Sequence, residues 1–133
     1  MAKYTPNTIY TYLKLQINWA CPDVYVTGVD EPISNQQKAV KIHEVGRYRP
    51  RGSVDLSNED EQYRIAYQAD VYSNLFNGHT DEAYETMHVV EEAFRKLFFI
   101  ETSCTPVERV DNRVARLVAR FERQVCEGDE MPE

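Results

Sequence analysis

Residues 61–73 read EQYRIAYQADVYS, and apolar and polar side chains alternate along the stretch. Because successive side chains of a β-strand point to opposite faces, this pattern predicts a strand with one buried face and one face in water. The expected buried set is Tyr63, Ile65, Tyr67, Ala69 and Val71, and the expected solvent-facing set is Arg64, Gln68 and Asp70. The pair Asn77-Gly78 favours a turn and ends the strand.

A long helix is predicted after this turn. Thr80 is suited to cap its start, and Asp81 and Glu82 fall in the first turn, where the helix dipole favours negative charge. Apolar residues then recur at a spacing of three or four, as on the buried face of an amphipathic helix: Ala83, Met87, Val90, Phe94 and Leu97.

The N-terminal part predicts a shorter helix and two strands. Thr5-Pro6 marks the helix start, and one face of that helix carries Ile9, Tyr12, Leu13 and Ile17. Residues 23–26 form a brief β run that ends at Gly28. Residues 39–48 mostly alternate, which predicts a strand with one wet side.

The last two elements are less clear from the residues. Residues 98–110 favour a strand that runs into a turn at Cys104-Thr105-Pro106. In residues 114–125 two patterns compete: the helical spacing of Val114, Leu117, Val118, Phe121 and Val125, and the alternation of Ala115, Leu117, Ala119 and Phe121. The helical spacing and the content of Ala, Leu and Arg favour a helix. The residues alone therefore predict the order α-β-β-β-α-β, followed by an element of either kind.

The length of 133 residues suits one domain, and the composition, 42% hydrophobic and 28% charged, is that of a globular protein. We expect a single domain over residues 1–126 and an acidic, disordered tail over residues 127–133. No apolar run approaches the roughly 18 residues of a membrane span. The first residues lack the apolar run of a secretory signal, so the chain is expected in the cytosol before any assembly.

Residues with the spacing of a catalytic or metal site are missing from the sequence. It has no Gly-rich phosphate loop, HExxH or GxSxG motif. Its three cysteines, Cys21, Cys104 and Cys126, lack CxxC spacing and are expected to be free thiols, and the three histidines, His43, His79 and His88, do not complete a zinc site. The adjacent Glu91 and Glu92 point apart on a helix. We predict no catalytic residue, no cofactor and no metal.

Charge points to contacts with proteins. The net charge is −7, which disfavours general binding of polyphosphate. The run Arg47-Tyr48-Arg49-Pro50-Arg51 mixes cations with an aromatic residue, which can indicate nucleic-acid contact. Because acidic residues follow closely, a charged hairpin that grips an acidic neighbour is the favoured interpretation. The predicted interface residues are Arg47, Tyr48, Arg49, Arg51, Asp55 and Glu59.

Three segments together resemble one protein family. Residues 61–74, EQYRIAYQADVYSN, resemble its "YEVNVYSN" strand, and VVEEAF at residues 89–94 resembles its "VVDEAF" helix. VARLVARFE at residues 114–122 is similar to its closing "YRMVARYE" element. The family is that of the tail-completion, or tail-terminator, proteins, which join head to tail in the neck of long-tailed bacteriophages. The likeness covers most of residues 8–125.

The resemblance implies an α+β fold of order α-β-β-β-α-β-β, mainly an antiparallel sheet packed against two helices, with a long charged hairpin. It turns the expectation for residues 114–124 to a strand, because pairing often overrides helix propensity. It also implies a virion protein whose subunits form a ring of six that caps the tail tube. Two departures are Leu97-Phe98-Phe99, where many relatives have a Gly after the second helix, and the charged loop 47–58.

The partners implied are the tail-tube protein and the head-closure, or connector, protein, with genomic DNA passing through the ring without specific binding and no membrane involved. Two other functions stay open. One is another neck component, a head-closure or adaptor protein, which would be richer in barrel strands and would lack the long second helix. The other is a small regulatory protein that binds nucleic acid through its arginines. An enzyme is the least favoured.

Overall fold

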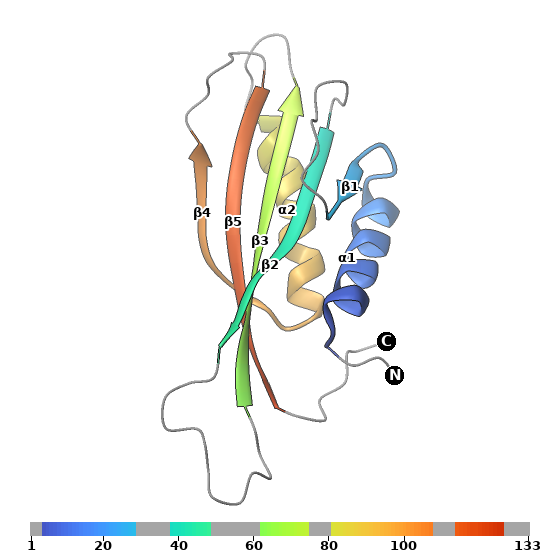
Figure 1. The fold of residues 1–133 in the computed structure, drawn as a ribbon. Helices are drawn as coiled ribbons and strands as arrows, with labels where there is room; N and C mark the ends of the chain where they lie inside the picture. The colour runs from blue at the N-terminus through green and yellow to red at the C-terminus, as the bar shows by residue number, and fades with distance from the viewer. Residues whose placement is uncertain (1–3, 29–37, 49–61, 75–80, 108–113, 127–133) are drawn as a thin grey trace, which may run out of the picture.

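The computed structural model describes residues 4–28, 38–48, 62–74, 81–107 and 114–126, and it contains two helices and one five-stranded sheet (Figure 1). In chain order the elements are α1 (Pro6–Ala20), β1 (Tyr25–Thr27), β2 (Lys38–Tyr48), β3 (Gln62–Asn74), α2 (Asp81–Lys96), β4 (Ile100–Val107) and β5 (Val114–Cys126). This order confirms the α-β-β-β-α-β-β expectation. The predicted N-cap at Thr80, most of the charged hairpin and the acidic tail lie outside the described residues.

The strands are ordered β1-β2-β3-β5-β4 across the sheet. Only β1 and β2 run parallel among these neighbours, and every other pair is antiparallel. β3 lies at the centre, and its alternation is the one predicted: Ile65, Tyr67, Ala69 and Val71 are buried beneath the helices. This strand pairs along its length with β2 and β5, so its register sets which face of each neighbour enters the core.

The helix that spacing favoured for residues 114–125 is wrong, and the strand is confirmed. β5 pairs with β3 from Val114 opposite Asn74 to Cys126 opposite Gln62, and it also pairs with β4 on its other side. Its alternate residues Leu117, Ala119 and Phe121 are buried. Two pairing partners and a half-buried face therefore outweigh the helix propensity of its Ala, Leu and Arg residues.

The turn expected at Cys104-Thr105-Pro106 is also wrong, because these residues continue β4. β4 is an outer strand of the sheet, so it needs hydrogen bonds on one side only. Such a strand tolerates a proline, which has no N–H to donate. A register shift between Glu101 and Ser103 marks an irregularity in the same strand.

Both helices pack on one face of the sheet, α1 against β1 and β2 and α2 against β3, β4 and β5 (Figure 1). The hydroxyl of Thr5 caps α1 by accepting from the Thr8 N–H, while the Thr5 N–H donates to Thr8 Oγ1. The centre of the core is an aromatic cluster in which the rings of Phe94 and Phe121 stack with their centroids 4.0 Å apart. Tyr67 and Phe99 contact Phe94 edge-on or tilted. None of the described helices is both long and apolar enough to cross a membrane.

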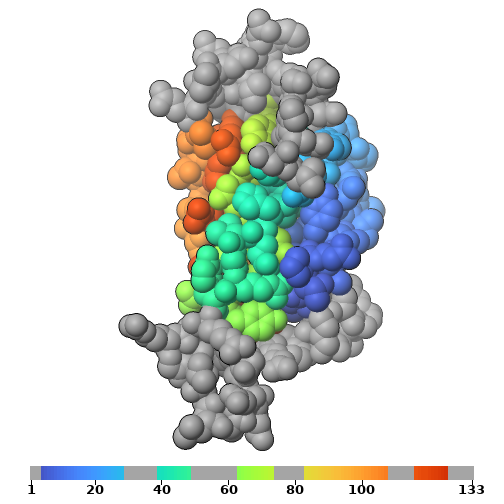
Figure 2. Space-filling model, in the orientation of Figure 1, coloured from blue at the N-terminus to red at the C-terminus, as the bar shows by residue number. Residues whose placement is uncertain are grey.

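Neither helix covers the opposite face of the sheet, where Figure 2 shows atoms of β2, β3, β5 and β4 side by side. A buried carboxylate lies on this face. Asp70 is 2% exposed, accepts from Arg116 at 2.7 Å and from Gln68 at 2.9 Å, and lies 3.5 Å from the hydroxyl of Tyr72. The guanidinium of Arg116 also lies over the Tyr72 ring. Asp70 was expected to face solvent, and its neighbours on the wet face instead enclose it.

Candidate functional site

The predicted interface residues fall into two groups. Arg47 and Tyr48 end β2, whereas Arg49, Arg51, Asp55 and Glu59 lie outside the described residues. Arg47 donates to Glu44 at 2.7 Å and to the carbonyl of Tyr4 at 2.9 Å, and it lies over the ring of Tyr63. These contacts tie the segment before α1 to the sheet. Tyr48 is 51% exposed.

A tryptophan patch lies on α1, away from the stripe of that helix that enters the core. It consists of Leu15, 66% exposed, and Trp19, 83% exposed, one helical turn apart. Beside Trp19, α1 and α2 enclose a shallow groove of about 140 Å³, lined by Gln16, Ala20, His88, Val89, Glu92, Ala93 and Lys96. An exposed tryptophan beside a groove is typical of a protein contact. The signal in the sequence was a single tryptophan out of phase with Ile9, Leu13 and Ile17.

A second exposed region, where two large apolar side chains lie among polar and charged ones, is found where α2 passes into β4. It is a hollow of about 340 Å³ lined by Arg64, Phe98, Ile100, Thr102, Glu122, Arg123 and Gln124, called here the phenylalanine hollow. Phe98 is 63% exposed and Ile100 is 70% exposed. The guanidinium of Arg123 lies 4.6 Å from the ring centre of Tyr4 and 5.4 Å from that of Phe98. Its Nε is buried with no hydrogen-bond partner among the described residues.

Phe98 has an unusual backbone. Its φ is +65°, and it is the only residue other than glycine with positive φ in the part of the chain described. The Phe98 N–H donates to the Arg95 carbonyl and the Phe99 N–H to the Phe94 carbonyl, which is the hydrogen-bonding pattern that ends many helices with a glycine. A side chain at this position costs about 1 kcal/mol. The departure from glycine noticed in the sequence therefore falls on a strained, exposed aromatic residue.

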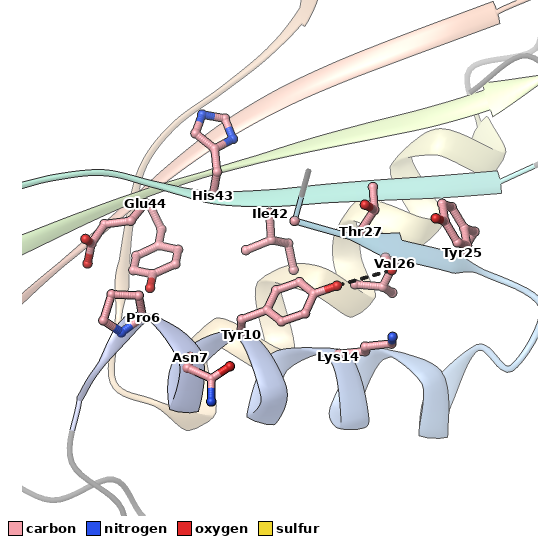
Figure 3. Close-up of a pocket in the computed structure, with 12 residues that line it drawn as sticks. Pro6, Asn7, Tyr10, Lys14, Tyr25, Val26, Thr27, Ile42, His43 and Glu44 are labelled. Atoms are coloured by element: carbon pink, nitrogen blue, oxygen red, sulfur yellow. Dashed lines mark hydrogen bonds between the residues drawn. The ribbon is translucent and has the colours of Figure 1, made fainter. Parts of the chain in front are cut away.

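A larger cavity of about 580 Å³ opens between α1 and the strands β1 and β2 (Figure 3). Tyr10 and Ile42 lie on its inner side, where the Tyr10 hydroxyl donates to the Val26 carbonyl, and His43 points to the other side of β2. Tyr67 also lines it, and burial, reinforced by the charge of Glu44, raises the pKa of the Tyr67 hydroxyl. This phenol therefore stays neutral at physiological pH.

One group of side chains could hold a metal ion. The ligand atoms of Glu91, Glu101 and Cys104 lie within 4.8 Å of one another, Glu91 on α2 and the other two on β4. Burial raises the pKa of Glu101 to about 7, and a hydrogen bond with Glu91 and its charge add to the rise. Burial and the same two carboxyl groups raise the pKa of the Cys104 thiol, which makes it a poor nucleophile. Spacing along the chain does not predict this group, because its members meet only where α2 packs against β4.

This group predicts a pH effect on stability. Glu101 binds a proton in the folded chain up to about pH 7, while the ordinary value of 4.5 applies on unfolding, so stability falls as pH rises between these values. Replacing Glu101 with glutamine should remove this loss and leave the variant more stable than wild type at about pH 8. The gain should stay below about 1 kcal/mol because Glu101 is an exposed residue whose carboxyl is only partly buried against Glu91, so solvent screens its charge. Urea titrations at about pH 5 and pH 8 measure it. Glu92→Gln is the control, and equal pH slopes in wild type and Glu101→Gln would contradict the assignment.

Comparison with models of known protein families gives no match, and comparison with curated proteins gives none either.

Proposed function

We propose that this chain is a structural virion protein of the neck of a long-tailed bacteriophage, a tail terminator whose ring ends the tail tube and joins it to the head connector. The observation that carries the proposal is that residues 114–126 form a strand, β5. The residues of this segment favour a helix, the resemblance to tail-terminator proteins implies a strand, and the segment is a strand. The full order of helices and strands agrees with the same resemblance.

The surface also supports a part that assembles head to tail. A ring whose subunits all face the same way needs two different patches on each subunit. The tryptophan patch and the phenylalanine hollow are two such patches, and they differ in shape and charge. The net charge of −7 suits a ring through which DNA passes without being held.

The long second helix favours a tail terminator over a head-closure protein. α2 spans 16 residues and supplies Met87, Val90 and Phe94 to the core, so it is part of the domain rather than an addition to it. A head-closure protein would be expected to replace it with further strands.

The proposed function predicts that the protein stops tail growth. Adding it to polymerising tail-tube protein should limit tube length, and negative-stain microscopy should show a ring with a central hole on one end of each tube. The heat-denatured protein is the control for a general effect of added protein. Tubes that keep their uncapped ends and their unlimited length would reject the proposal.

A further inference from the structure

The tryptophan patch and the phenylalanine hollow are too far apart to contact each other within one chain. Trp19 lies in the last turn of α1. The hollow is next to Tyr4, before the first turn of the same helix, because Arg123 stacks on both Tyr4 and Phe98. A 15-residue helix is about 20 Å long, so the two features are separated by its length. Each is therefore left for another molecule.

Phe98 indicates that the hollow has a use beyond stability. A glycine at this position would avoid the strain of a positive φ, and the exposed ring of Phe98 gains little burial in return. Strained residues that the fold does not need tend to occur where a protein binds something. The contact with Arg123 keeps the Phe98 ring facing the hollow.

The chemistry of the hollow suits an indole ring. Phe98 and Ile100 are the apolar part of its lining. Arg64 is exposed, and its side chain has no partner within the described ranges. The guanidinium of Arg123 already lies over the rings of Tyr4 and Phe98 and donates to the Leu97 carbonyl, so it forms part of the wall of the hollow. Guanidinium groups are attracted to the negative face of an aromatic ring, and most strongly to that of tryptophan. The Glu122 carboxylate in the same lining can accept a hydrogen bond from the indole N–H.

We propose that the phenylalanine hollow receives Trp19 of a second copy of this chain. The contact joins two different patches, so it repeats from copy to copy and either closes into a ring or grows as a filament. It deepens the proposed function, on which it rests, by naming the contact between neighbouring subunits. The Arg64 cation of the hollow and the electron-rich ring of Trp19 supply its specificity.

Phe98→Gly in the full chain separates this role from a structural one. Removing the strain should raise the Tm by about 3–6 °C, while the loss of the hollow's wall should weaken self-association at least tenfold. Trp19→Ala should weaken self-association equally with little change in Tm. Tyr84→Ala, which removes a 48% exposed side chain from α2, is the matched control and should change neither. Sedimentation gives the dissociation constants.

The emission of Trp19 is a second readout, because it is the only tryptophan in the chain. In wild type the emission should shift to shorter wavelength as concentration rises and the indole leaves water, and in Phe98→Gly the shift should disappear. Self-association that neither variant weakens overturns the proposal, and so does a wild type that stays monomeric at about 1 mM. If the protein instead forms filaments or open oligomers that depend on Trp19 and Phe98, the proposed contact is correct and the proposed ring is wrong.

Discussion

Replacing Phe94 with alanine should lower the free energy of unfolding by about 4 kcal/mol. Phe94 is fully buried on α2 and joins that helix to the sheet through its stack on Phe121. Its ring also contacts Tyr67 and Phe99, so the truncation leaves a cavity that its aromatic neighbours cannot fill. A domain of this size has a stability of about 5–15 kcal/mol, so much of it would be lost.

Urea denaturation followed by circular dichroism measures this loss. Tyr84→Ala on the same helix is the control and should cost less than about 0.5 kcal/mol, because that side chain is half exposed. Phe94→Leu keeps most of the volume and should cost no more than about 1.5 kcal/mol. A loss below about 1.5 kcal/mol for Phe94→Ala would show that the aromatic cluster is not the centre of the core.

Replacing Arg116 with leucine should lower the free energy of unfolding by about 3 kcal/mol. The side chain of Asp70 is 3% exposed, and Arg116 is its partner at 2.7 Å. Removing the cation leaves a buried carboxylate with the Gln68 amide and the more distant Tyr72 hydroxyl. An uncompensated buried charge is far more costly than the net value of the pair that contained it.

A double-mutant cycle separates the cost of leaving Asp70 uncompensated from the net contribution of the Asp70–Arg116 pair. Asp70→Leu combined with Arg116→Leu should recover most of the loss, because no charge then remains in the enclosed site. Arg120→Leu is the matched control, since Arg120 lies on the same face of β5 but is exposed, and it should cost little. Equal losses for Arg116→Leu and Arg120→Leu would contradict the role assigned to the buried pair.

The local sequence pattern was sufficient to predict a helix or strand where one face of the element is buried and the other faces solvent. The alternation of Ile65, Tyr67 and Ala69 predicted β3, and the three-and-four spacing of Met87, Val90 and Phe94 predicted α2. The pattern did not decide β5, because its residues fit both the helical and the strand period. Pairing with β3 and β4 determines that this segment is a strand. It also missed that Pro106 continues β4, since only the sheet order shows that this strand is an outer one.

The candidate site was less predictable than the fold. Of the interface residues proposed from the charged run, Arg47 has described contacts within its own chain, and Tyr48 is exposed. Trp19 is out of phase with the buried stripe of its helix, but the exposure of Trp19 and the backbone strain at Phe98 required three-dimensional information. The sequence showed that this chain has Leu97-Phe98-Phe99 where many members of the resembled family have a glycine. Only the positive φ of Phe98 shows that a non-glycine residue is strained there.

The neck role is tested most directly by deleting the gene from its phage and examining the lysate by electron microscopy, with the gene supplied from a plasmid as the control. We expect DNA-filled heads without attached tails, together with free tails whose length control is lost at the head-facing end, and normal virions when the gene is restored. Empty heads would place the protein earlier, in capsid assembly or DNA packaging. Normal, infectious virions from the deletion would contradict the proposed function outright.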